Sequence, residues 1–487
     1  MRKTTLPKVE TRLYIDGKWL EGMSGKEHEV INPATQEVIA KIAQAGETET
    51  KQAIEAAKRA FPAWRKLELA ERVEILRKIS SLLEEKADTL AKIMTIEQGK
   101  PLHEAKLEVL SGASTFLFAA EEARRLYGET IPAPNHHRYI VKKEPIGVVA
   151  AITPWNFPSG MATRKMAPAL AAGNTLILKP SSDTPLSAIA VFEIFEEAGL
   201  PKGVANLVMG DSKVVGGVLT ASDDVRKLTF TGSTAVGQKL FAQSGETLKK
   251  LSLELGGHAP FIVFDDADLD QAVEALVAAK FRNNGQVCVS PNRIFVDEKI
   301  QADFVEKLLA RVKKLKIGNG LDEGVDVGPL IREDAIEKID EQLTDAVNKG
   351  AKVLTGGGQL HGDEFDHGFF YQPTILDQVT QKMNIFYEET FGPVIPLIRF
   401  RTVEEAIEMA NDCEFGLASY FFTKDVARVE EVSDALEYGM VGVNEIAISN
   451  PETPFGGVKH SGFGRENGHY GLEEYLQVKF INLKYRD

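Results

Sequence analysis

The stretch IGVVAAITPWNFPSGMATRKMAPALAAGNTLILKP, residues 146–180, decides the fold class of this chain. It opens with a short apolar run (146–153) that has the length and composition of a buried strand. Residues 161–173 follow with helical spacing and end at a glycine, and residues 174–180 form a second short apolar run. A strand, a helix and a strand in this order predict a parallel sheet with helices on both faces.

The same alternation extends along the chain, so we expect an α/β fold. Downstream, the pattern predicts a helix at 185–199 and strands at 204–210, 226–232, 250–257 and 259–264. A second alternating region runs from about 290 to 445, with a strand at 291–296 and a helix at 301–315. The first third reads mostly as helices, at 47–64, 70–94 and 102–128, while 138–147 and 475–485 alternate like strands. Ligands of parallel sheets usually lie beyond the carboxyl ends of the strands.

Composition bounds the class of protein. A chain of 487 residues is long enough for two or three domains. The net charge of −14 argues against a nucleic-acid partner. The two cysteines, Cys288 and Cys413, suit a reducing compartment. No secretory signal and no apolar run of membrane-spanning length is visible, so we expect a cytoplasmic protein without a membrane partner.

Three residues near predicted strand ends or loops carry chemistry. Asn156 offers an amide donor in the turn TPWNFP (153–158), and Glu254 lies in the apolar strand LELGG (253–257). Cys288 lies in FRNNGQVCVS (281–290). Each also has a plain structural interpretation, respectively a capping asparagine, a glutamate that points at water and a small buried hydrophobe.

Together the three residues form a set with a thiol nucleophile, an amide donor and a carboxylate base. Desolvation among Leu253 and Leu255 should raise the pKa of Glu254, which suits a general base. A thiol nucleophile needs a site that favours the thiolate. The sequence near Cys288 has no histidine that would mark a Cys–His protease pair, and no metal is expected.

The chain resembles the aldehyde dehydrogenase superfamily in a series of motifs. TPWNFP, LILKPS, FTGS, LELGG, GQVC, EETFGPV (388–394) and PFGGVKHSGFGRENG (454–468) occur in the family's order. The resemblance implies a Rossmann-type cofactor-binding domain, an α/β catalytic domain and a small oligomerisation flap. We place these parts at residues 1–125 with 144–254, at 255–445, and at 126–143 with 468–487. The family forms homodimers and homotetramers, and the sequence does not choose between them.

The resemblance also implies a mechanism. Cys288 attacks the aldehyde to form a thiohemiacetal, while the Asn156 amide and the Cys288 backbone N–H form an oxyanion hole. Hydride passes to NAD or NADP, and Glu254 then activates the water that hydrolyses the thioester. Because this base is present, hydrolysis is favoured over transfer of the acyl group to coenzyme A.

Cofactor contacts carry over from the motifs. We expect Lys179 at the adenosine ribose and Glu389 at the nicotinamide ribose, although each could be a surface charge. Members strict for NAD often carry glutamate where this chain has Ser182, so we expect NADP to be accepted. Asp183 could restore a preference for NAD. The remaining expected cofactor residues are Gly232 and Ser233 at the pyrophosphate, Gly237 at the following helix, Trp155 and Phe391.

Three residues narrow the substrate. Arg164, Arg282 and Ser449 match positions that hold the far carboxylate of the substrate in succinate-semialdehyde dehydrogenases, and the planar guanidinium suits a carboxylate. Phe455 either lines the pocket or packs in the core. Glutarate semialdehyde, sulfolactaldehyde, lactaldehyde or a broad range of aldehydes stay open, as do arginines that face solvent or pair with structural acids. Some relatives have a second cysteine where this chain has Ser290, so we expect no local disulfide.

Overall fold

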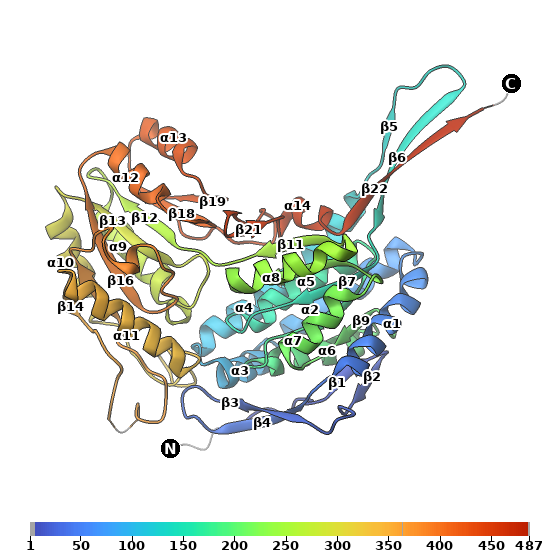
Figure 1. Cartoon of the computed structure of the whole chain (residues 1–487), viewed down its shortest axis with the longest axis horizontal. Helices are drawn as coiled ribbons and strands as arrows, with labels where there is room; N and C mark the ends of the chain where they lie inside the picture. The colour runs from blue at the N-terminus through green and yellow to red at the C-terminus, as the bar shows by residue number, and fades with distance from the viewer. Residues whose placement is uncertain (1–4, 363, 486–487) are drawn as a thin grey trace.

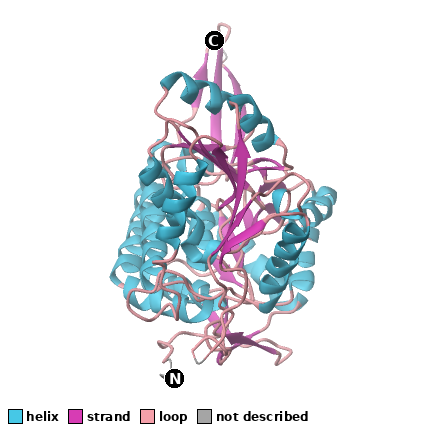
Figure 2. Cartoon of the chain, turned by 90° about the vertical axis from the view of Figure 1, so that its left-hand side faces the viewer, coloured by secondary structure: helices cyan, strands magenta, loops and turns pink. Residues whose placement is uncertain are grey.

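The computed structural model describes residues 5–362 and 364–485. Two lobes, each built on its own large sheet, lie side by side, and a strand arm projects from one of them (Figure 1). Turned by 90°, the molecule shows helices on both sides of the central strands (Figure 2). The α/β class expected from the sequence is confirmed. Within the described residues, no helix combines the length and the apolar character needed to cross a membrane.

The first lobe is built on an eight-stranded sheet with the order β2-β1-β9-β8-β7-β10-β11-β21. Its middle, from β9 to β11, is parallel, as the alternation predicts. β8 is buried along its whole length, as is typical of a parallel strand covered by helices. The strands are β1 (Leu13–Ile15), β2 (Lys18–Leu20), β7 (Val148–Ile152), β8 (Thr175–Lys179), β9 (Ala205–Leu207), β10 (Val225–Thr231), β11 (Lys250–Glu254) and β21 (Gly462–Phe463).

The helices of this lobe correct one expectation. The single helix predicted at 70–94 is two helices, α2 and α3, which meet at Lys86 (φ −95°, ψ 9°). The apolar spacing runs through the junction because Leu83 and Leu90, one from each helix, are buried in the same core. A hairpin of β3 (Glu27–Ile31) and β4 (Val38–Ala43) lies in the part read as mostly helical. The helices are α1 (Glu47–Trp64), α2 (Leu69–Glu85), α3 (Ala87–Gln98), α4 (Leu102–Glu122), α5 (Pro158–Ala171), α6 (Pro185–Ala198), α7 (Ser212–Ala221) and α8 (Thr234–Ser244), with short 3-10 turns η1 (Ala123–Arg125) and η2 (Gly245–Thr247).

The second lobe has a seven-stranded sheet with the order β14-β15-β16-β13-β12-β18-β19. Its core has two sides, because Phe261 packs in one apolar cluster and its neighbour Ile262 in another. The strands are β12 (Ala259–Val263), β13 (Pro291–Asp297), β14 (Lys352–Thr355), β15 (Thr374–Asp377), β16 (Val394–Phe400), β18 (Ala418–Phe422) and β19 (Met440–Val443), and β17 (Phe415–Gly416) pairs with β20 (Val458–Lys459). The helical segments are α9 (Leu269–Phe281), η3 (Arg282–Gly285), α10 (Gln301–Val312), α11 (Glu333–Asn348), η4 (Asn384–Phe386), α12 (Val403–Asn411) and α13 (Val426–Ala435).

The chain crosses between the lobes at residues 255–258. β11 ends the parallel part of the first sheet at Glu254, and β12 starts the second sheet at Ala259. Residues 462–463 then return to the first sheet, where Gly462 pairs with Glu254. The crossing therefore brings the carboxyl end of the first sheet next to the second lobe.

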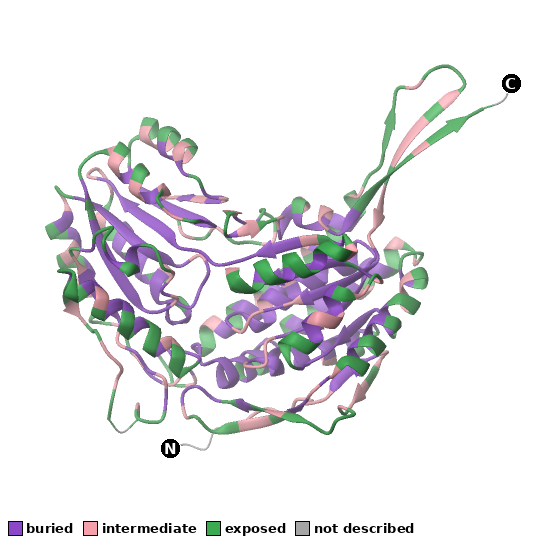
Figure 3. Cartoon of the chain, in the orientation of Figure 1, coloured by how far each residue is buried: buried purple, intermediate pink, exposed green. Residues whose placement is uncertain are grey.

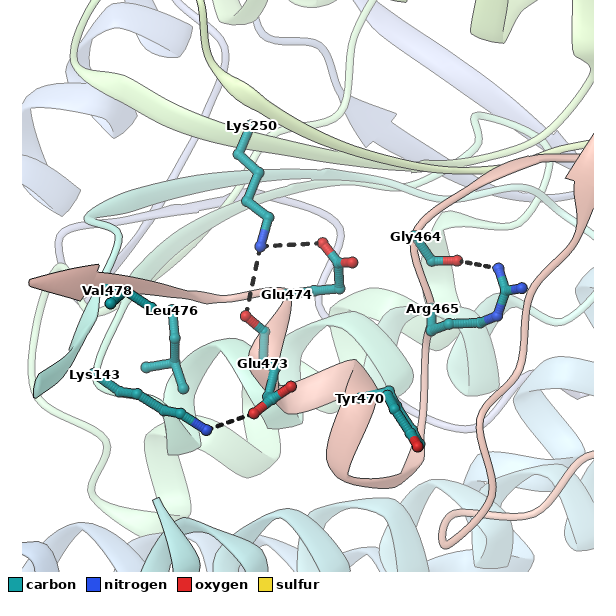
Figure 4. A pocket seen from close by; sticks show the side chains of 9 residues that line it. All are labelled: Lys143, Lys250, Gly464, Arg465, Tyr470, Glu473, Glu474, Leu476 and Val478. Atoms are coloured by element: carbon teal, nitrogen blue, oxygen red, sulfur yellow. Dashed lines mark hydrogen bonds and ion pairs between the residues drawn. The ribbon is translucent and has the colours of Figure 1, made fainter. Parts of the chain in front are cut away.

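The arm consists of β5 (Glu129–Ile131), β6 (His137–Pro145) and β22 (Leu476–Lys484), with α14 (Gly468–Glu473) before its last strand. Much of it is exposed, whereas the central strands of both large sheets, such as β8 and β12, are buried (Figure 3). A pocket of about 410 Å³ lies at its base (Figure 4). An ion pair of Lys143 and Glu473 and a second pair of Lys250 and Glu474 line this pocket. The proposed domain limits stay a prediction.

Candidate active site

Cys288 lies in the tight loop between η3 and β13. Asn283 (φ 48°) and Asn284 (φ 56°) are both left-handed, a conformation that asparagine tolerates better than most residues. Gly285 follows with φ 75°, and a Cβ there would lie 2.2 Å from the carbonyl oxygen of Gly392. Only glycine fits at this position. The loop leaves Cys288 only 8% exposed.

Glu254 is the last residue of β11 and is buried. Burial and, after it, the nearby Glu466 raise the pKa of its carboxyl, Arg164 and Lys165 oppose the shift, and the net result is a pKa of about 7. The direction expected from the sequence is confirmed. Within the described residues neither carboxylate oxygen has a partner at full hydrogen-bond geometry, although the Cys288 thiol interacts with the carboxylate and lowers its pKa. The group is therefore placed to accept a proton at neutral pH.

The surroundings of Cys288 do not favour the thiolate that a thiol nucleophile needs. Burial raises the pKa of the thiol well above its usual range, and the charge of Glu254 raises it again. The guanidinium of Arg164 acts in the opposite direction but does not outweigh them. The resting thiol is therefore protonated, and it needs a base to become a nucleophile. Glu254 is the carboxylate that interacts with it.

Asn156 lies between β7 and α5, on the first lobe. Its Nδ2 donates to the carbonyl oxygen of Gln286, at 3.0 Å, two residues before Cys288. Its Oδ1 is buried without a hydrogen-bond partner. The amide donor is thus aimed at the loop that carries the thiol, across the boundary between the lobes.

The predicted substrate residues fall into two groups. Arg164, on α5, donates to the Ser449 hydroxyl at 2.9 Å and lies over the ring of Phe455, 4.4 Å from its centroid. Phe455 is 2% exposed and belongs to the same apolar cluster as Cys288. Arg282 is separate from these contacts and exposed.

Arg282 stacks instead over Phe157, 4.9 Å from the ring centroid. Phe157 packs with Met161 and Val287, and Val287 directly precedes Cys288. The two arginines therefore reach the surroundings of the thiol through two different aromatic residues.

The predicted nucleotide residues lie at the carboxyl ends of the first sheet. Lys179 ends β8 and is buried, which lowers the pKa of its ammonium, while Asp211 and Asp183 oppose this shift. Ser182 lies three residues further on and is half-buried. Ser233 is the N-cap of α8.

Gly232 and Gly237 lie near Ser233, at positions where a larger residue would crowd a neighbouring side chain. A Cβ at Gly232 would lie 2.5 Å from the ring of Phe230. A Cβ at Gly237, in the first turns of α8, would lie 2.4 Å from Leu255, so this glycine lets the helix pack closely on the chain after β11.

Glu389 and two aromatic residues form the other end of this region. The Glu389 carboxylate accepts the backbone N–H of Gly257 at 3.0 Å, and burial raises its pKa to about 7. Trp155 and Phe391 meet edge to face with their centroids 5.6 Å apart. These two contacts join the first lobe and the crossing segment to the second lobe.

Residues 19–481 match the sequence profile of the aldehyde dehydrogenase family. The chain belongs to this family. It is an NAD(P)-dependent oxidoreductase, and the family resemblance read from the motifs is confirmed.

Several relatives are similar to this aldehyde dehydrogenase along nearly all of its length. It is 54% identical to a glutarate-semialdehyde dehydrogenase of Pseudomonas putida, with 96% of each chain covered. It is 52% identical to a 3-sulfolactaldehyde dehydrogenase of Pseudomonas putida (98% and 97% covered) and 52% identical to an NADP(+) succinate-semialdehyde dehydrogenase of Escherichia coli (96% of each). The crystal structure of a succinate-semialdehyde dehydrogenase from Burkholderia pseudomallei matches with a TM-score of 0.96 at 50% identity, and covers both chains fully.

The residues present in this aldehyde dehydrogenase fit a dinucleotide. The N-terminus of α8, which begins after the N-cap Ser233, offers N–H groups to a pyrophosphate. The buried ammonium of Lys179 and the buried carboxylate of Glu389 can each bond ribose hydroxyls.

Sequence analysis missed one charged cluster beside the thiol. Lys165 Nζ lies 2.5 Å from Glu466 Oε1, and Arg164 lies 3.7 Å from the other oxygen of Glu466. Two cations share one carboxylate, so the cluster has a net positive charge next to Glu254. The only sequence signal was a pair of adjacent cations, Arg164 and Lys165, in an otherwise apolar helix.

The charge of Asp183 bears on the choice between NAD and NADP, because Asp183 directly follows Ser182. Its carboxylate pairs with Arg332, at 3.2 Å, and accepts the Ser181 hydroxyl at 3.3 Å. Arg332 comes from the segment before α11, in the second lobe. The negative charge of Asp183 is thus partly neutralised from across the boundary between the lobes.

Proposed function

We propose that this enzyme oxidises succinate semialdehyde, or an aldehyde with a similarly placed anionic group, to the carboxylic acid. The observation that carries the proposal is the cationic character of the substrate side. Arg164 and Ser449 are joined by a hydrogen bond. Within the described residues the buried Arg164 Nη1 makes no hydrogen bond, because its carboxylate neighbour Glu466 lies 3.7 Å away. A substrate carboxylate would supply an acceptor at hydrogen-bond distance.

The chemistry that we propose starts with Glu254. Its carboxylate, with a pKa of about 7, takes the proton of Cys288, and the sulfur adds to the aldehyde carbon. The carbonyl oxygen becomes an oxyanion, which the Asn156 amide and the Cys288 N–H stabilise. A nicotinamide cofactor held by Lys179 and Glu389 would supply the hydride acceptor for this oxidation. Glu254 releases the thiol proton to solvent before hydrolysis and then removes a proton from water, so that hydroxide attacks the thioester. The tetrahedral adduct expels the Cys288 thiolate, which takes the proton back from Glu254 as the acid is released.

The length of the anionic substrate is not specified by the arginines alone. The relatives named above act, by their names, on glutarate semialdehyde, 3-sulfolactaldehyde and succinate semialdehyde. Each of these has an anionic group at the end away from the aldehyde. This shared property supports the anionic class more strongly than any one member of it.

We also propose that NADP is accepted alongside NAD. Ser182 carries no charge that would repel a 2′-phosphate, and the Asp183 carboxylate beside it is paired with Arg332. An exposed ion pair leaves part of the negative field in place, so a modest preference is expected rather than an absolute one.

The arm supports a proposal of assembly. Val478 (71% exposed) and Phe480 (56% exposed) place large apolar side chains on the surface of β22. We propose that the arm joins copies of this chain into a homodimer or homotetramer. A cytoplasmic location stays a prediction from the cysteine content.

The test of the proposed substrate compares succinate semialdehyde with butyraldehyde, a neutral aldehyde of equal carbon number, with NAD and NADP in parallel. We expect kcat/KM to favour the anionic aldehyde by about 100-fold or more, which is about 2.7 kcal/mol of transition-state discrimination. Glutarate semialdehyde and 3-sulfolactaldehyde measured alongside decide the chain length and the anion. Equal values for the anionic and neutral aldehydes would leave a broad-range aldehyde dehydrogenase.

A further inference from the structure

A buried ion pair lies directly beneath the turn that carries Asn156. Lys100, just after α3, and Glu108, on α4, meet with Nζ and Oε2 2.5 Å apart. Their side chains are 0% and 3% exposed. Neither residue is a substrate, cofactor or nucleophile residue of the proposed mechanism. The sequence gives no sign of the pair, because Glu108 looks like an ordinary charge on a helix and Lys100 like one in the loop before it.

Both members of the pair bond the backbone of this turn. Lys100 Nζ donates to the carbonyl oxygen of Asn156 at 2.8 Å. Glu108 Oε1 accepts the backbone N–H of Ser159 at 3.0 Å and that of Gly160 at 2.8 Å. The pair therefore holds the chain on both sides of Phe157, whose ring centroid lies 3.9 Å from the Lys100 ammonium.

The same turn is tied to the loop of the nucleophile through Asn283. Its Nδ2 donates to the carbonyl oxygens of both Asn156 (3.0 Å) and Gln286 (3.2 Å). Gln98 donates to the Oδ1 of Asn283 at 2.9 Å. The Asn156 carbonyl oxygen thus has two donors, and the Asn156 side-chain amide is left directed at the loop that carries the thiol.

Stability alone is a weak explanation for such a pair. Desolvation of two charges offsets much of their attraction, and an apolar pair of similar volume often stabilises a fold as well. What an apolar pair cannot do is bond one carbonyl oxygen and two N–H groups at once, and thereby fix where this turn lies. An oxyanion donor is effective only when it is held close to its productive position.

We propose that Lys100 and Glu108 are positioning residues for the oxidation, and that they act by fixing the backbone of residues 156–160 so that the Asn156 amide meets the oxyanion. This inference rests on the oxyanion role proposed for Asn156. Neither residue touches the substrate or transfers a proton in the reaction. The pair is thus the support of the oxyanion hole on the side of the first lobe.

A double-mutant cycle tests the inference. The rate of NAD(P)H formation is measured in single turnover, with butyraldehyde, for the wild type, Lys100→Met, Asn156→Ala and the double variant. We expect Lys100→Met to lower the rate about 10- to 100-fold in the wild-type background, with the KM of the cofactor within twofold. In the Asn156→Ala background, the same substitution should change the rate less than about twofold. Equal losses in both backgrounds would overturn the proposal.

Two further variants provide a substitute for Lys100→Met and a control for this test. Glu108→Asp keeps both charges and moves the carboxylate by one methylene, so it provides the same cycle if Lys100→Met does not fold. Additive losses with Glu108→Asp overturn the proposal. Lys227→Met is the matched control, because Lys227 is also a buried lysine of this lobe but bonds Ser252 and lies beside Val149, near the start of β7. Its effect should be the same in both backgrounds.

The cycle separates this inference from the proposed function. Butyraldehyde makes the result independent of any preference for anionic substrates. If Asn156→Ala alone loses no activity, the oxyanion role of Asn156 is wrong and the inference fails with it. If Asn156→Ala loses activity but the cycle is additive, only the positioning role is wrong.

Discussion

Inside the candidate site, Cys288, Glu254 and Asn156 are buried, whereas Arg282 and Ser449 on the proposed substrate side are exposed. Burial raises the pKa of Glu254 to about 7 and that of Cys288 well above its usual range. The exposed guanidinium of Arg282 stacks on the ring of Phe157 and, among the described residues, makes no such contact with the reacting groups. The low polarity of the buried region shifts the pKa values of the reacting groups. At the exposed residues that would select the substrate, water and salt screen the charge interactions. Substitutions inside should therefore abolish the reaction, and substitutions outside should change which substrate is used.

The largest expected effect is that of removing the nucleophile. Cys288→Ala should lower kcat by at least about 1,000-fold with every aldehyde, because no covalent intermediate can form. Cys413→Ala is the matched control, since Cys413 is the other free cysteine and its sulfur only accepts the N–H of Phe415. Turnover of Cys288→Ala near the wild-type rate would mean that the chemistry does not run through a thiol.

Glu254→Gln should follow, with kcat lowered about 100- to 10,000-fold. The wild-type rate should rise with pH through about 7, because the carboxylate with its raised pKa acts only when deprotonated. The glutamine has no proton to lose, so its pH profile should lack this rising limb. A limb that persists unchanged in Glu254→Gln would assign it to another group.

The contrast between inside and outside also separates what the sequence could and could not predict. Glu254 ends a strand and Asn156 lies just past one, and both strands have apolar runs that are visible in the sequence. The motif around Cys288 is a short continuous stretch, so it too can be found in the sequence. Lys165 and Glu466 are 301 positions apart and meet only because residues 462–463 return to the first sheet. Likewise, Lys100 reaches Asn156 from a separate helical region. No local pattern encodes such contacts, since they depend on how helices pack against strand ends.

The next effect concerns selectivity. Arg282→Gln should lower kcat/KM for succinate semialdehyde about 10- to 50-fold and change that for butyraldehyde less than about threefold. Arg311→Gln, which removes a half-buried arginine paired with Glu274, is the control. Equal losses on both aldehydes would count against a carboxylate contact.

Arg164→Gln should give a different result, because Arg164 acts on the buried Glu254 and also bonds the exposed Ser449. Its charge lowers the pKa of Glu254, so Arg164→Gln should move the rising limb of the pH profile to higher pH. At pH 7 the base is then less often deprotonated, and the rates for anionic and neutral aldehydes should both fall. Comparison with Arg282→Gln at pH 7 and at pH 9 separates loss of substrate binding from loss of the base. A limb that stays in place would mean that Arg164 does not act on Glu254.

The smallest effect is expected at the cofactor. Arg332→Gln should lower the ratio of kcat/KM with NADP to that with NAD about 3- to 10-fold, because the freed Asp183 carboxylate then opposes a 2′-phosphate. Since the pair is partly exposed, the effect should shrink as salt is added. Asp183→Asn in the same variant should restore the ratio if Arg332 acts by neutralising Asp183. If the ratio stays low in the double variant, Arg332 itself contacts the phosphate. Equal losses with NAD and NADP would exclude both roles and leave the pair as a tie between the lobes.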